Sequence, residues 1–187
     1  MLRRIFWILN FCVLLSFQVV TANSTHTHSK QPGDSIDMPI PQKNLKLGNE
    51  FLAENKNKHG VHTLPSGLQY KISHEGQGTP PGPTDFVTVN YRGMLTNGTE
   101  FDSSYTHNMP ATFAVNAVIP GWTEILQLMK PGSKWTVYIP PNLAYGEYGA
   151  GRLIGPNATL VFDIELLSIK PALDEIPNGF NEEIDED

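Results

Sequence analysis

The chain has 187 residues, of which 17% are charged and 40% are hydrophobic, and its formal net charge is −6. This length is enough for one folded domain with appended segments. The 16 Gly and 15 Pro residues are typical of a turn-rich fold that contains β-strands, and they argue against a helical bundle. The acidic balance argues against a nucleic-acid partner, because proteins that bind nucleic acids usually present basic patches.

Residues 1–22 have the composition of a signal peptide. Arg3 and Arg4 precede an apolar stretch, and Ala22 ends a small-residue cleavage site. The apolar stretch is shorter than the roughly 20 clean apolar residues of a membrane span. We therefore expect cleavage and no stable membrane insertion afterwards. Because Cys12 is the only cysteine, the mature chain is expected to lack both disulfides and thiol chemistry.

The segment after the signal peptide is expected to contain a polar linker over residues 23–44 and a short helix with its connection over residues 45–61. Leu45, Phe51 and Leu52 form one apolar stripe of this helix. No long amphipathic helix precedes it, so the sequence offers no dimerisation stalk and favours a monomer.

Residues 62–170 show the alternation of apolar and polar side chains that is typical of strands. The alternating groups lie at 68–72, 87–91, 135–139 and 160–166. Strands that are apolar on one face predict an antiparallel sheet covered on one side. Asn97-Gly98 predicts a two-residue hairpin turn of type I′, which needs positive φ twice. After this domain, residues 171–187 carry seven acidic residues and no basic one, which predicts an acidic, disordered tail.

One helical stripe interrupts the strands. Trp122, Ile125, Leu126 and Met129 follow helical spacing, and Pro120 precedes them. This helix is the only candidate cover for the sheet. The fold class is therefore α+β, with an antiparallel sheet of four to six strands and one short helix.

The sequence contains no motif of a nucleophilic, nucleotide-binding or metal-dependent enzyme. The six histidines lack the spacing of a metal site, so no metal and no cofactor is expected. Asp102 follows a hairpin strand, Trp122 opens the helix and Tyr145 lies in a loop between prolines and a glycine. Each has an ordinary structural explanation, as a turn residue, a core residue or a packed ring. Together they also suit an apolar, aromatic-lined cavity for a small ligand or a peptide side chain. Residue chemistry alone does not choose between binding and catalysis.

Five segments in chain order resemble the FKBP-type peptidyl-prolyl cis-trans isomerases. They are VTVNYRGML at 87–95, GTEFDSS at 98–104, VIPGW at 118–122, LAYG at 143–146 and IGPNATLVF at 154–162. Within that family the chain is most similar to the macrophage infectivity potentiator (Mip) branch. The similarity to this branch lies in PATF at 110–113, GWTE at 121–124, LQLM at 126–129, LPSGLQY at 64–70 and FLAENK at 51–56.

The resemblance implies a half-barrel sheet wrapped around the short helix and a pocket for proline. It assigns Asp102 and Tyr145 as the catalytic polar groups, with Tyr145 donating to the substrate carbonyl and Asp102 organising the polar edge beside Tyr91. It places the other substrate-binding side chains around them, with one as the floor and the rest as walls. The floor is Trp122, and the walls are Tyr91, Phe101, Val118, Ile119, Ile154 and Phe162. The chain departs from many family members at Ala111, where they have an aromatic residue, and at Ala150, where they often have His.

The function implied by the resemblance is isomerisation of X–Pro bonds in exported or host proteins, which assists their folding. The alternative is a proline-peptide binding module or holdase chaperone with little turnover. The expected partners are proline-containing polypeptides and macrolide inhibitors of the FKBP class. The Mip-like resemblance favours a bacterial periplasm, outer-membrane surface or secreted protein. The alternative is a eukaryotic secretory route, where sequons at Asn23, Asn97 and Asn157 become meaningful.

Overall fold

The structure is a computed structural model that describes residues 38–172. The expected signal peptide, most of the polar linker and nearly all of the acidic tail lie outside the described residues.

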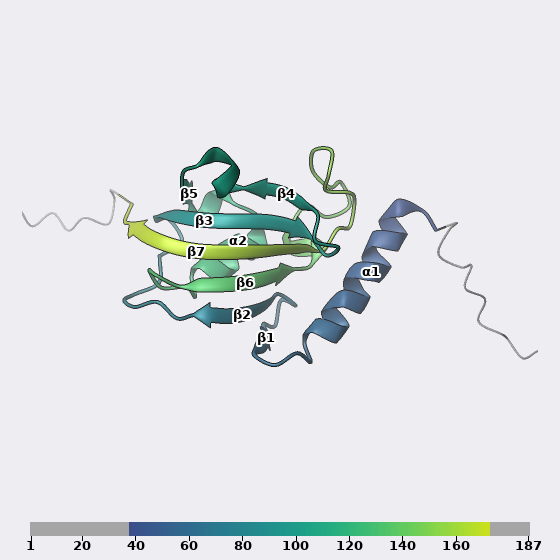
Figure 1. The fold of residues 1–187 in the computed structure, drawn as a ribbon, viewed down its shortest axis with the longest axis horizontal. Helices are drawn as coiled ribbons and strands as arrows, with labels where there is room; N and C mark the ends of the chain where they lie inside the picture. The colour runs from purple at the N-terminus through teal and green to yellow at the C-terminus, as the bar shows by residue number, and fades with distance from the viewer. Residues whose placement is uncertain (1–37, 173–187) are drawn as a thin grey trace, which may run out of the picture. The chain divides into compact units, whose positions relative to one another are not determined.

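Across residues 38–172 a seven-stranded antiparallel sheet forms the body of the domain. Its order is β1-β2-β6-β7-β3-β4, and β5 also pairs with β3 (Figure 1). The strands are β1 (Val61–Thr63), β2 (Gln69–His74), β3 (Phe86–Leu95), β4 (Glu100–Ser103), β5 (Ala111–Ala114), β6 (Lys134–Ile139) and β7 (Leu160–Lys170). The α+β class and the antiparallel pairing are confirmed, but the sheet has one strand more than the upper expectation. The excess arises because β1 and β5 are only three and four residues long.

The predicted covering helix is α2 (Pro120–Leu126), which lies against one face of the sheet. Pro120 stands at the first helical position, where the missing N–H has no intrahelical partner to lose. Trp122, Ile125 and Leu126 are buried on the sheet. They pack with apolar side chains of the central strands, including Val87 and Val89 of β3 and Val137 of β6, in one hydrophobic core.

A second helix, α1 (Ile40–Asn55), begins five residues before the predicted Leu45 and ends within the predicted range of 45–61. The residues before Leu45 are therefore not all linker. Pro39 precedes the first turn and Pro41 lies within it, and proline is compatible with that first turn because the turn's N–H groups have no intrahelical acceptor. Neither α1 nor any other helix between residues 38 and 172 is long and apolar enough to cross a membrane.

Strand β2 departs from the predicted alternation. Ile72 is 38% exposed, whereas the polar Gln69 is only 4% exposed. The Gln69 amide donates to Leu52 O at 2.9 Å and accepts from the Asn55 amide at 2.9 Å, both at the end of α1. The second face of the sheet is thus covered by α1 at this point, which the pattern of β2 alone does not reveal.

The turn between β3 and β4 also differs from the expectation. Gly98 N donates to Leu95 O, and Leu95 N donates to Thr99 O, so the loop has three residues. Gly98 has φ +85°, but Asn97 is not in the left-handed region. The prediction of a type I′ turn is wrong, because a turn followed by one left-handed glycine satisfies the same Asn-Gly pair.

Candidate active site

A cavity of about 450 Å³ opens beside α2, and it is lined mainly by aromatic and aliphatic side chains. Strands β3, β4, β5 and β7, helix α2 and two loops all contribute to it. The lining residues are Tyr91, Phe101, Asp102, Phe113, Ala117, Val118, Ile119, Trp122, Tyr145 and Phe162. An apolar cavity with two or three polar groups at its edge is a typical binding site for an organic ligand or a peptide side chain.

The floor of the cavity is the indole of Trp122, which is 4% exposed. Three aromatic rings meet it edge to face, with centroid distances of 5.4 Å to Tyr91, 5.6 Å to Phe113 and 5.3 Å to Phe162. Edge-to-face pairs are favourable because the positive ring edge meets the negative ring face. The indole is therefore held in one orientation by rings from β3, β5 and β7.

One wall consists of Phe101 and Phe162, whose rings lie 5.6 Å apart at an interplanar angle of 83°. Gly93 of β3 makes this arrangement possible. A Cβ at position 93 would lie 2.6 Å from Phe101 Cε2 and 2.8 Å from Phe162 Cε1. Only glycine at position 93 leaves room for both rings to pack over strand β3 here.

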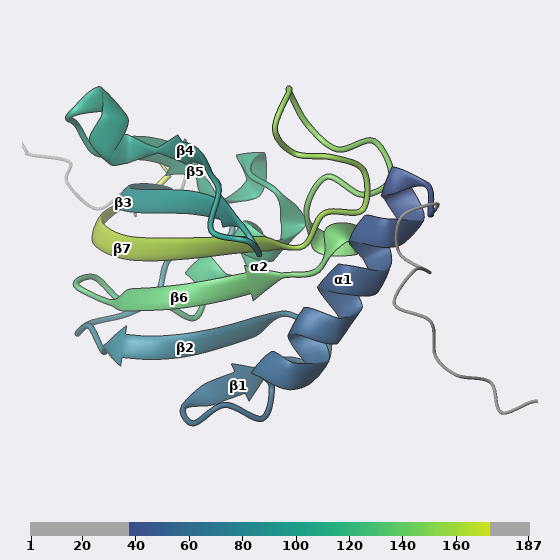
Figure 2. The same cartoon turned by 45° about the vertical axis from the view of Figure 1, so that its right-hand side comes forward.

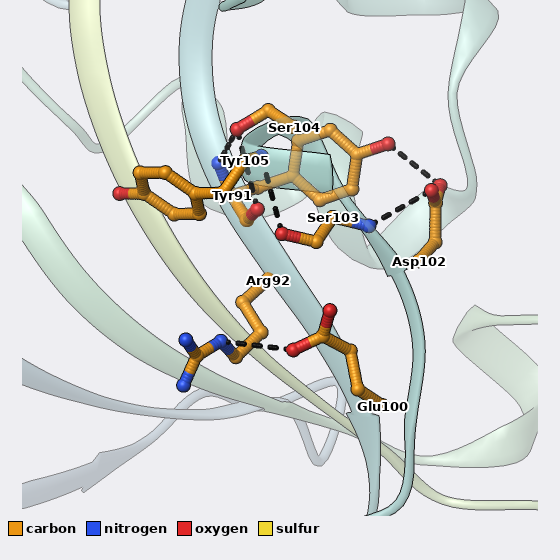
Figure 3. A network of polar contacts seen from close by, with 7 residues as sticks. All are labelled: Tyr91, Arg92, Glu100, Asp102, Ser103, Ser104 and Tyr105. Atoms are coloured by element: carbon orange, nitrogen blue, oxygen red, sulfur yellow. Dashed lines mark hydrogen bonds and ion pairs between the residues drawn. The ribbon is translucent and has the colours of Figure 1, made fainter. Parts of the chain in front are cut away.

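The polar edge is built by β3 and β4. The Tyr91 hydroxyl donates to Asp102 Oδ2 at 2.6 Å, and Asp102 Oδ1 accepts from Ser103 N at 2.9 Å (Figure 3). The Ser104 hydroxyl accepts from Tyr91 N at 3.0 Å. Both oxygens of Asp102 are thus engaged within the strand pair, and the carboxylate holds the phenol of Tyr91 in place.

The two tyrosines at the pocket remain hydroxyl donors at neutral pH. Burial raises the pKa of Tyr91, and the hydrogen bond to Asp102 raises it further. Burial also raises the pKa of Tyr145, with the negative charge of Asp102 acting in the same direction. Both effects disfavour the charged phenolate.

Tyr145 stands on the loop that leads from the short 3₁₀ helix η3 (Pro141–Leu143) to β7. Its side chain is 38% exposed and reaches the cavity from one side. Gly146, with φ +55°, turns the chain directly after it. Gly146 N donates to Pro141 O at 2.9 Å, which closes the turn that carries Tyr145.

The structure brings eight of the nine predicted site residues to this cavity, and their individual roles remain predictions. Ile154 is the exception, because it is buried and is not among the side chains that line the cavity. Phe113 and Ala117 line the cavity but were not expected to. Phe113 lies two residues after Ala111 on β5, and this four-residue strand is too short to show a period in the sequence. No cluster of three metal-binding side chains occurs within the described part of the chain.

Comparisons with known proteins agree with this geometry. Residues 77–167 match the model of the FKBP-type peptidyl-prolyl cis-trans isomerase family, and residues 20–72 match that of the domain amino-terminal to such isomerases. The chain is 55% identical over 127 residues to the peptidyl-prolyl cis-trans isomerase Mip of Coxiella burnetii, covering 68% of this chain and 55% of the relative. It is 54% identical over 131 residues to the outer membrane protein MIP of Legionella longbeachae, covering 70% and 56%.

A crystal structure of a peptidyl-prolyl cis-trans isomerase from Pseudomonas syringae superposes with a TM-score of 0.67 at 40% identity. The match covers 72% of this chain and 98% of that one. The chain therefore belongs to the FKBP-type peptidyl-prolyl cis-trans isomerases, in the Mip-like branch. It spans a little over half the length of the two curated relatives described above.

Proposed function

We propose that this protein accelerates cis–trans rotation of X–Pro bonds in exported polypeptides and so assists their folding. The observation that carries the proposal is the cavity whose floor is Trp122 and whose polar groups are confined to Tyr91, Asp102 and Tyr145. A pyrrolidine ring is compact and apolar, and the indole face offers it a flat platform. The carbonyl before the proline then lies at the edge where the tyrosine hydroxyls are.

The reaction needs no nucleophile. Peptide-bond rotation crosses a barrier of about 18–20 kcal/mol because resonance gives the C–N bond partial double-bond character. In the twisted transition state this resonance is lost, so the carbonyl is less polar than in the planar amide. A pocket that excludes water destabilises the planar form more than the twisted one. Complementarity to the twisted geometry then lowers the barrier.

Tyr145 is the residue we assign to the substrate carbonyl. Its hydroxyl is protonated at neutral pH, since burial and the charge of Asp102 both raise its pKa. A neutral donor can hold the carbonyl oxygen while the amide rotates. Asp102 acts through its hydrogen bond with Tyr91, which organises the polar edge, and no proton transfer is required.

The expected site of action is outside the cytoplasm, in the bacterial envelope or beyond it. This rests on the signal-peptide composition of residues 1–22 and on the similarity to a protein named for the outer membrane. We further propose that the mature chain is a monomer and that FKBP-class macrolides occupy the same cavity. Light scattering of the mature chain tests the first of these, and a dimer mass that does not depend on concentration would contradict it.

The activity is tested by following cis-to-trans exchange of a short X–Pro peptide by NMR, with enzyme at micromolar concentration. We expect acceleration, and a preference for an apolar X because the walls are apolar. A domain shown by circular dichroism to be folded, yet leaving the uncatalysed rate unchanged, would refute the isomerase. If such a domain still suppressed aggregation of an unfolded protein, the holdase alternative would replace the isomerase proposal.

A further inference from the structure

The loop that carries Tyr145 is held internally by a few backbone hydrogen bonds, among them the pair between Ala150 and Ile154. Residues 144–159 connect η3 to β7, and their middle is solvent-exposed, with Tyr148 95% and Leu153 53% exposed. Gly146, Gly149 and Gly151 all have positive φ. Such a backbone loses much conformational entropy when it is ordered. Contacts outside the loop are therefore important for holding Tyr145 at the cavity.

Helix α1 supplies contacts of this kind at the base of the loop. The Asn44 amide donates to Pro156 O at 2.8 Å, and the Asn157 amide donates to Pro41 O at 3.4 Å. Farther along the helix, Gly48 lies directly against the Thr159 side chain, where a Cβ would collide with Thr159 Oγ1. Figure 2 shows the first half of α1 beside this loop.

A single residue joins these contacts to Tyr145. Asn157 adopts the left-handed conformation, with φ 56°. In this conformation its side chain reaches Pro41 of α1 while its backbone N–H donates to Gly146 O at 2.8 Å. Gly146 is the immediate neighbour of Tyr145. The path from helix to tyrosine thus consists of two hydrogen bonds and one peptide unit.

No residue of α1 lines the cavity. An effect of α1 on turnover would therefore be indirect, and the contacts of α1 with this loop connect it to Tyr145. The Asn44 contact is suited to this, because it is part-buried and joins residues 112 positions apart in the chain.

We propose that α1 positions Tyr145 for catalysis, with Asn44 and Asn157 as the positioning residues. The inference rests on the proposed isomerase function. When α1 is docked, the loop base is fixed and the Tyr145 hydroxyl stays at the cavity edge. When the contact is lost, the loop samples other arrangements and the hydroxyl is correctly placed for a smaller fraction of the time.

The test is a double-mutant cycle between Asn44→Ala and Tyr145→Phe in the full-length mature chain, read out as kcat and KM for a proline peptide. One hydrogen bond contributes about 0.5–1.5 kcal/mol, so we expect Asn44→Ala to lower kcat about two- to twelvefold with little change in KM. In the Tyr145→Phe background the same change should cost less than about twofold, because the hydroxyl it positions is gone. Lys43→Ala, an exposed neighbour on the same helix, is the matched control and should change neither parameter.

Hydrogen exchange gives a readout that is independent of turnover. The amides of Gly146 and Asn157 should lose protection in Asn44→Ala and keep it in Lys43→Ala. Gly48→Ala disturbs the contact of the same helix with Thr159 and should reproduce the Asn44→Ala pattern. The test therefore still works if one of the two variants folds poorly. Equal losses of kcat in both Tyr145 backgrounds, or unchanged kcat in Asn44→Ala and Gly48→Ala, would overturn the positioning role while leaving the isomerase intact. An inactive wild-type chain would overturn both.

Discussion

The hydroxyl of Tyr91 and the carboxylate of Asp102 are joined by a 2.6 Å hydrogen bond that links β3 to β4 at the edge of the aromatic cavity. The carboxylate is solvent-exposed while the phenol is buried. The exposed carboxylate of Asp102 thus holds the hydroxyl group of the buried Tyr91 ring in place. It also places one negative charge where it raises the pKa of both pocket tyrosines.

Replacing Asp102 by Asn should lower the pKa of Tyr91 and of Tyr145 toward the ordinary tyrosine value. The pKa of Tyr91 should still lie above the ordinary tyrosine value, because burial is the larger cause of its shift. Absorbance of phenolate against pH in the wild type and in Asp102→Asn measures this. Glu100→Gln, which removes an exposed carboxylate from the same strand, is the control and should leave both values in place. Unchanged tyrosine titration in Asp102→Asn would contradict the coupling.

The same shift predicts how stability depends on pH. Because the folded pKa of Tyr91 lies above its unfolded value near 10, the neutral phenol stabilises the fold fully below that pH. This contribution is lost as the pH rises above about 10. Urea unfolding at pH 8 and pH 10.5 should therefore show a smaller loss of stability in Tyr91→Phe, which has no ionisable phenol, than in the wild type.

Tyr145→Ala and Asp102→Ala should each lower turnover substantially while leaving the fold intact. Both side chains are partly or largely exposed, so truncation leaves no large cavity. We expect less than about 2 kcal/mol of destabilisation for either change. Peptide turnover and urea unfolding of the same preparations measure the two effects. Turnover that falls only in step with the folded fraction would show that these residues support packing and not catalysis.

Trp122→Ala should behave differently, because the indole is 4% exposed and packed against three rings. Its removal leaves a cavity beneath the site, and truncating a buried aromatic costs about 3–5 kcal/mol. Leu128→Ala is the control: it lies just after α2 and is 41% exposed, so it should cost far less. A Trp122→Ala loss no larger than that of Leu128→Ala would mean that the indole is not a structural part of the floor.

Long elements with one apolar face were predictable from the sequence. Strands β3, β6 and β7 and helix α2 each repeat their pattern over enough residues to reveal the period. The short strand β5 could not be found in this way, because its four residues become a strand only through pairing with β3. The start of α1 was hidden for another reason: prolines 39 and 41 fit a linker as well as a first helical turn.

The cavity was predictable in outline through the family resemblance, which associated Asp102 with Tyr91 and placed Trp122 as the floor. Phe113 was missed together with β5, the strand that aims its ring at the indole. Ile154 was expected in the wall, but it is buried in the loop before β7 and is not among the side chains that line the cavity. The direction of a side chain in an irregular loop depends on such tertiary contacts, and no periodicity encodes it.

Gly93→Ala should weaken substrate binding more than it weakens the fold. The added Cβ would meet Phe101 and Phe162 at 2.6 to 2.8 Å, so the two wall rings must shift. We expect a higher KM for apolar X–Pro peptides, measured by initial rates over a range of peptide concentrations. Gly82→Ala is the matched control, since its Cβ would meet only Asp85 at ordinary distances. Equal KM values in the two variants would show that the position of this wall does not affect binding.

An FKBP-class macrolide should inhibit the isomerase by competing for the cavity, and Ala111→Phe should tighten its binding. Ala111 lies on the same face of β5 as Phe113 and packs against the core, so a phenyl ring there would extend the wall that Phe113 begins. At about 25 cal/mol per Å² of added apolar contact, the gain is about 1–2 kcal/mol, or roughly tenfold in Kd. Thr112→Phe adds the same ring to the opposite face of the strand, where Thr112 is exposed, and should leave Kd unchanged. Inhibitor titration of peptide turnover measures all three proteins. Equal gains from both phenylalanines would show a nonspecific effect, and turnover that survives a saturating macrolide would mean that catalysis occurs outside this cavity.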